Sequence, residues 1–80
     1  MRSLRFLVPS AGALIVFETA GRLQSFTAAG RELGMSQAAV SQAIRSLEAQ
    51  LGVSLFRREH RKVVLTDAGR RFFADVTLGL

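Results

Sequence analysis

The 80 residues, of which 49% are hydrophobic and 21% charged, suffice for one small globular domain and argue against intrinsic disorder. The absence of cysteine excludes disulfides and thiolate metal sites and indicates a reducing, cytoplasmic compartment, and a single histidine excludes a His-rich metal cluster. Eleven Lys and Arg against six acids give a net charge of +5, which favours a polyanionic partner, nucleic acid before an anionic membrane surface. The longest apolar run, 11–17, is far below the roughly 20 residues that span a bilayer.

Three helices are predicted in the first part of the chain from capping residues, glycines and apolar spacing. They span 11–20, 26–33 and 37–51. The expected N-caps are Ser10, Ser25 and Ser36, and the expected helix ends are Gly21, Gly34 and Gly52. The short connection between the second and third helices predicts a helix-turn-helix over 26–45.

The third of these helices has two unlike sides. Its apolar seam consists of Val40, Ile44, Leu47 and Leu51. The opposite side carries Ala38, Ser41, Gln42, Arg45 and Ala49. Because this side is small and polar and lacks the dense ion pairs of an ordinary solvated helix face, it is suited to lie against a flat polar surface.

After the third helix, the helical spacing of apolar residues gives way to short runs of β-formers, which predicts a β-hairpin. The runs 53–56 and 63–65 are rich in β-formers and flank the basic segment 57–62, which indicates a hairpin with a basic tip. A lone hairpin is marginal in water, so it is expected to pack on the helices. Two orientations are open for Arg57, which either points inward from its strand or pairs with Glu59.

The last segment predicts a fourth helix that begins after Thr66, with Asp67 suited to the positive first turn. Its apolar stripe consists of Ala68, Phe72, Phe73, Val76 and Leu80. Since this stripe exceeds what one small domain covers, part of it is expected to meet a second copy across a two-fold axis. The stripe is still running at the last residue, as in a helix that is cut short.

Together these elements predict a mainly α, winged helix-turn-helix fold with a three-helix core, a small two-stranded wing and a C-terminal linker helix. The DNA major groove, about 12 Å wide, admits one helix whose outer side chains hydrogen-bond to base edges. Gln pairs well with adenine, Arg with guanine, and Ser with either kind of edge.

Six sequence segments carry a family resemblance. They are SFTAA at 25–29, SQAAVS at 36–41, IRSLE at 44–48, LGV at 51–53, LFRR at 55–58 and LTDAG at 65–69. Their combination resembles the N-terminal domain of LysR-type transcriptional regulators over about residues 9–76. Phe17-Glu18, the QAAVS run and the FRRxHR run are most similar to the subgroup of the glycine-cleavage activator.

The resemblance implies roles for individual residues. Base-reading positions fall on Gln37, Ala38, Ser41 and Gln42. Phosphate contacts fall on Ser25, Thr27, Ser36 and Arg45, and wing contacts fall on Arg58, Arg61 and Lys62. The apolar stripe assigns dimerisation to Phe72, Phe73, Val76 and Leu80. Relatives often have Arg at position 42 and Pro or Ser at position 38, so their operator preference does not transfer to this chain.

The resemblance also implies an organisation. Residues 9–66 form the DNA-binding domain, with the recognition helix at 37–51 and the wing at 55–65, and 67–80 begins the linker helix. In this family the domain binds an inverted-repeat operator in double-stranded DNA as a homodimer, within a tetramer in the full-length protein. A small-molecule effector binds only to a C-terminal domain, which is absent from this chain. No cofactor, metal, membrane contact or enzymatic activity is expected.

The alternative from another functional class is a basic amphipathic module that binds an acidic membrane or a protein partner. The two hypotheses differ in a simple observation. A folded three-helix core melts cooperatively in buffer alone, whereas a membrane-active segment gains helix only when lipid is present.

Overall fold

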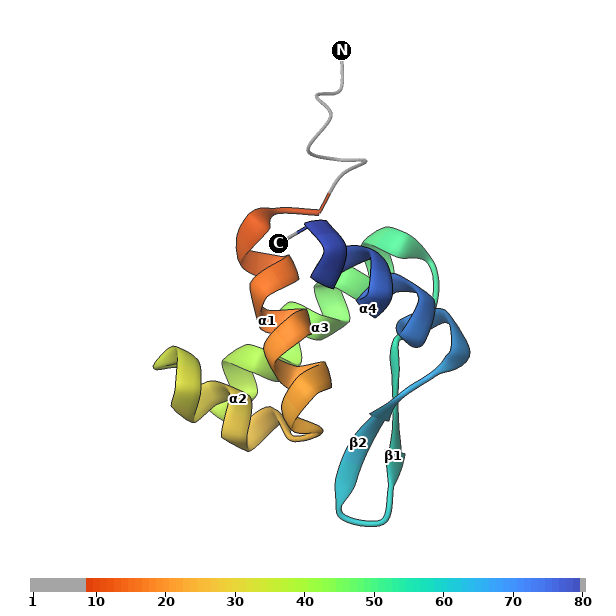
Figure 1. The fold of residues 1–80 in the computed structure, drawn as a ribbon. Helices are drawn as coiled ribbons and strands as arrows, with labels where there is room; N and C mark the ends of the chain where they lie inside the picture. The colour runs from red at the N-terminus through yellow and green to blue at the C-terminus, as the bar shows by residue number, and fades with distance from the viewer. Residues whose placement is uncertain (1–8, 80) are drawn as a thin grey trace.

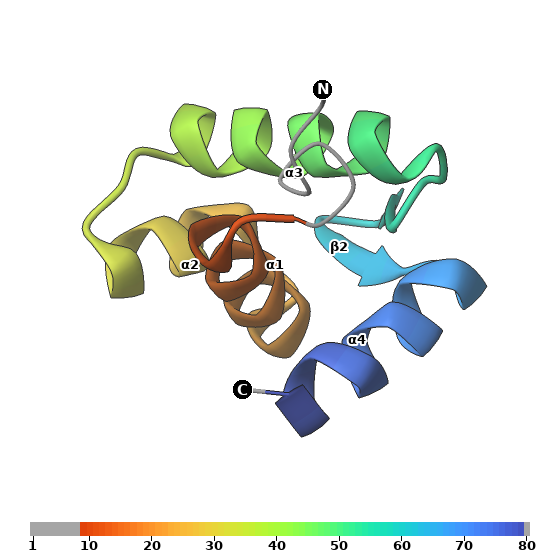
Figure 2. The same cartoon turned by 90° about the horizontal axis from the view of Figure 1, so that it is seen from above.

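The computed structural model describes residues 9–79, which form four helices and a two-stranded antiparallel sheet (Figure 1). In chain order they are α1 (Ala11–Leu23), α2 (Phe26–Leu33), α3 (Gln37–Leu51), β1 (Phe56–Glu59), β2 (Lys62–Leu65) and α4 (Asp67–Gly79). Seen from above, α1 lies between α3 and α4 (Figure 2). The predicted winged helix-turn-helix fold is therefore confirmed. Among the described helices, none has the length and apolar character needed to cross a bilayer.

The helix boundaries follow from local capping. The hydroxyl oxygens of Ser10, Ser25 and Ser36 each accept a hydrogen bond from the backbone N–H three residues later, at 3.0 to 3.1 Å. Each bond satisfies an N–H group that has no partner within its own helix. Gly34 and Gly52 adopt the left-handed conformation, with φ of 70° and 73°, and end α2 and α3. These three N-caps and two helix ends are as predicted.

The predicted end of α1 at Gly21 is wrong. The helix continues to Leu23, and Gln24, with φ of 54°, is the left-handed residue that ends it. A Cβ atom at position 21 would lie 2.9 Å from the ring of Phe73. The glycine therefore permits a close approach between α1 and α4, which is a tertiary requirement that the local sequence does not reveal.

The hairpin differs in extent from its prediction. The strands pair in antiparallel register from Phe56↔Leu65 to Glu59↔Lys62, so the wing spans 56–65. Residues 53–55 lie outside the strand, and the N–H of Leu55 donates to the side chain of Glu48. Arg57 and Arg58 consequently lie on β1, and the tip is a two-residue turn at 60–61.

The core is centred on Phe17, which is fully buried in α1. Its ring lies 5.6 Å from that of Phe56 in the wing, 5.1 Å from Phe72 and 6.0 Å from Phe73, measured between ring centroids. Aromatic rings at these separations stabilise one another beyond their buried area. The hairpin and α4 thus share one core with the helical unit.

This core changes the interpretation of the apolar stripe on α4. Phe72 and Phe73 are half-buried against Phe17, and Val76 is 6% exposed within the single chain. Val76 therefore has little surface left for a second copy, whereas Phe72 and Phe73 have only part of theirs covered. Leu80, the fourth expected dimerisation residue, lies outside the described residues.

Candidate nucleic-acid interface

The outward side of α3 carries a connected set of polar side chains. Arg45 donates from Nη1 to Ser41 Oγ at 3.1 Å and from Nη2 to Gln42 Oε1 at 3.2 Å. Gln42 Nε2 in turn donates to Ser46 Oγ at 3.5 Å. Gln37, Gln42 and Arg45 are exposed, and Ser41 is half-buried. The network shows that Arg45 lies on the same side as the predicted base-reading residues.

Ser46 also belongs to this polar side of α3, although it was not predicted from the sequence. It follows Gln42 by four residues, which places the two side chains on neighbouring positions of one helix face. This four-residue spacing could have predicted from the sequence that Ser46 belongs to the same face. Ala38, which is also exposed, stands at the start of the same surface and supplies only a methyl group.

Three separate segments meet at a polar hollow of about 80 Å³. Its lining consists of Ser25, Phe26, Thr27, Gln37, Arg58, Arg61, Lys62 and Val63. The structure thus brings together the start of α2, the start of α3 and the wing. All three predicted wing residues line this hollow, with two of the predicted phosphate contacts and one base-reading residue. Ser36 and Arg45 lie outside it.

The charges around this hollow are not neutralised by acids. Within residues 9–79, no ion pair joins Arg58, Arg61 or Lys62 to a carboxylate. The first turns of α2 and α3 add the partial positive charge of helix N-termini, and neither contains an acidic residue. The hollow therefore has the electrostatics of an anion-binding surface.

Other arginines are engaged within the fold. Arg57 pairs with Glu59 at 3.2 Å, which decides between its two open orientations. Arg22 donates to Glu32 at 2.7 Å and to Glu18 at 3.1 Å. These carboxylates, Glu32 first, raise the pKa of Arg22 above its usual value. Arg22 thereby joins α1 to α2 and is fixed away from the hollow.

Two of the predicted phosphate contacts already have a structural role. Ser25 and Ser36 accept hydrogen bonds as N-caps, yet a hydroxyl group can still donate its own hydrogen to an anion. Thr27 is exposed in the first turn of α2. All three are therefore placed where a phosphate oxygen would also meet backbone N–H groups.

A mostly apolar hollow of about 620 Å³ is lined by α1, the end of α2 and α3. None of its lining residues is a predicted site residue, and none is ionisable. It consequently offers no acid or base for catalysis.

Comparison with known proteins identifies the family. The sequence profile described as "Bacterial regulatory helix-turn-helix protein, lysR family" matches residues 12–70. The chain belongs to this family. The recognition made from the sequence is therefore confirmed. The LysR-family glycine cleavage system transcriptional activator of Escherichia coli strain K12 is 49% identical over 69 residues, which cover 86% of this chain. The chain spans 23% of the length of that regulator.

Solved structures of LysR-family domains with DNA have the same fold. A BenM DBD/benA site 1 DNA complex matches with a TM-score of 0.82 and 32% identity, covering 86% of this chain and 78% of that one. A CbnR DBD–DNA complex matches with a TM-score of 0.80 and 34% identity, covering 84% and 77%. In both complexes, the domain that this chain resembles is bound to DNA.

Proposed function

We propose that this domain binds double-stranded DNA in a sequence-specific manner, as the DNA-binding part of a bacterial LysR-type transcriptional regulator. The observation that carries the proposal is the polar hollow, where Arg58, Arg61 and Lys62 meet the starts of α2 and α3 and pair with no acid of the described residues. An arrangement of this kind suits the phosphate backbone, which dominates affinity. The DNA complexes of the similar BenM and CbnR domains support the same assignment.

In this proposal α3 enters the major groove and its exposed polar side chains read base edges. The reading residues are Gln37, Ala38, Ser41 and Gln42. Arg45 orients the amide of Gln42, because the guanidinium donates to Oε1. In the free domain Nε2 donates to Ser46, and its second hydrogen can donate to a base edge. Phosphate contacts from Ser25, Thr27, Ser36 and Arg45 fix the register of the helix, and the wing lies on the backbone or in the minor groove.

Two copies are needed to match an inverted repeat, with their α3 helices about one turn of DNA apart. We assign the pairing to α4. Since Phe72, Phe73 and Val76 pack against their own core, the contact falls on the exposed side of α4, where Leu78 is 87% exposed. Tetramer formation and effector binding are proposed for parts of the regulator beyond this chain.

Binding of the 80-residue chain to duplex DNA at several salt concentrations tests the proposal. If about three phosphates are neutralised per domain, log affinity falls against log salt concentration with a slope of about −3. Affinity that does not change between low and moderate salt would contradict the electrostatic part of the proposal. Vesicles of anionic lipid serve as the comparison, because the alternative membrane-binding module would gain helix only in their presence.

A further inference from the structure

The side chain of Glu48 joins the recognition helix to the base of the wing. Its Oε2 accepts from the backbone N–H of Leu55 at 2.7 Å and from that of Phe56 at 3.2 Å. The carboxylate is half-buried, whereas Leu55 and Phe56 are buried. We propose that Glu48 is a positioning residue, which fixes the wing relative to α3 and so determines how the wing cations meet DNA. This inference rests on the proposed function.

The place of Glu48 in its helix supports a specific role. It lies in the last turn of α3, where its backbone carbonyl accepts from Gly52 N at 2.8 Å. A carboxylate at this end of a helix is disfavoured by the negative end of the helix dipole. The two amide donors of the wing compensate for this, and hydrogen bonds to a charged acceptor are the stronger kind. The same bonds satisfy two N–H groups of buried residues.

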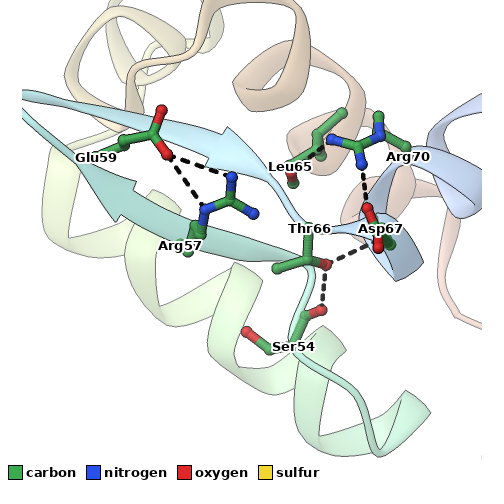
Figure 3. A network of polar contacts seen from close by, with 8 residues as sticks. Ser54, Arg57, Glu59, Leu65, Thr66, Asp67 and Arg70 are labelled. Carbon is green, nitrogen blue, oxygen red and sulfur yellow. Dashed lines mark hydrogen bonds and ion pairs between the residues drawn. The ribbon is translucent and has the colours of Figure 1, made fainter.

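A second attachment holds the same segment from the side of α4 (Figure 3). Thr66 Oγ1 donates to the carbonyl of Ser54 at 2.6 Å, and Thr66 N donates to the carbonyl of Leu55 at 3.0 Å. Thus Glu48 of α3 holds the N–H groups of Leu55 and Phe56, and Thr66, directly before α4, holds the carbonyls of Ser54 and Leu55. The strand that carries Arg58 leaves from this clamped segment.

The segment also determines where the wing points. The ring of Phe56 packs edge-on against Phe26 at the start of α2, with centroids 5.3 Å apart. On the other strand, Val63 N donates to the carbonyl of Gln24 at 3.3 Å. Phe26 and Val63 line the polar hollow, so displacement of β1 at Phe56 would move Arg58 and its neighbours away from Gln37.

A double-mutant cycle in the 80-residue chain tests the role of Glu48. Removal of an acid raises the net charge, which by itself strengthens DNA binding. We expect the opposite for Glu48→Ala, namely roughly three- to tenfold weaker binding and a salt slope reduced by about one. In the Arg58→Ala plus Arg61→Ala plus Lys62→Ala background the same change should alter affinity less than about twofold, because the wing contacts are already absent.

Two further variants separate positioning from general stability. Glu48→Gln keeps an oxygen acceptor and should retain most of the native affinity for DNA. If Glu48→Ala fails to fold, the affinity of Glu48→Gln is measured in its place. Glu32→Ala removes an acid of α2 that pairs with Arg22, and it should bind DNA at least as well as the native chain.

The outcomes distinguish the two proposals. Equal losses for Glu48→Ala in both backgrounds, or binding as strong as that of Glu32→Ala, would overturn the positioning role while leaving DNA binding intact. A native chain with no salt-dependent binding to DNA would instead overturn the proposed function.

Discussion

Arg45 lies in the middle of the polar side of α3, where it donates to both Ser41 and Gln42. A guanidinium has five donors and no acceptor, so it orders the acceptors around it. Because these bonds use two of the five N–H groups, Arg45 keeps donors for the phosphate contact that is expected from the family pattern. In the free domain, the hydrogen bond from Arg45 holds the side chain of Gln42 in one orientation.

We expect base reading and anchoring to separate at the residue scale. Gln37→Ala or Gln42→Ala should lower the preference for operator over random DNA by roughly 1 to 3 kcal/mol per lost base contact. Arg61→Ala or Lys62→Ala should weaken binding to both DNAs similarly and reduce the salt slope by about one. Competition binding with the two DNAs measures both quantities. Loss of specificity in Arg61→Ala with none in Gln37→Ala would reverse these roles.

At the scale of elements, the start of α4 packs closely on the base of the wing. A Cβ atom at Gly69 would run into the carbonyl oxygen of Leu55, which already accepts from Thr66 N. Backbone on both sides cannot move aside as a flexible side chain does. Gly69 therefore permits the close contact that completes the attachment of the wing.

Gly69→Ala is accordingly expected to lower the free energy of unfolding by about 1 to 3 kcal/mol, the usual range for overpacking a tight site. Chemical denaturation of the two chains measures the difference. Gly79→Ala is the matched control, because nothing lies within 4 Å of a Cβ atom there. The control should be neutral or slightly stabilising, and equal effects of the two changes would contradict the proposed clash.

The elements also show which parts of the fold could be predicted from sequence. Serine and threonine caps and the 3.6-residue spacing act within a few residues, so α2, α3 and the start of α4 could be predicted. The beginning of β1 and the role of Gly21 depend on partners far along the chain, Glu48 and Phe73. Likewise, the residue types at the candidate site could be predicted, but the convergence of three segments on one hollow depends on tertiary packing.

At the scale of the whole molecule, assembly depends on the exposed side of α4. Leu78→Asp changes a side chain that is 87% exposed, so the fold should persist. A charge there would be buried without a partner in a two-fold contact through α4, and the dimer should be destabilised. Sedimentation at several concentrations, with and without an inverted-repeat DNA, measures this.

The choice of position matters for that experiment. Phe73→Asp would place a charge against Phe17 and Gly21 and would disturb the monomer itself. Dimerisation and DNA binding of Leu78→Asp at the native level would exclude this side of α4 as the contact.

The pairing of charges within the fold has a consequence for the approach to a partner. Arg22, Arg57 and Arg70 are each matched by a nearby carboxylate, whereas the three cations of the polar hollow have no such partner within residues 9–79. In this part of the chain, the hollow is therefore a patch of uncompensated positive charge. A polyanion attracts such a patch before any contact forms. The domain would arrive with its wing and helix starts foremost, so that salt slows association more than it speeds dissociation.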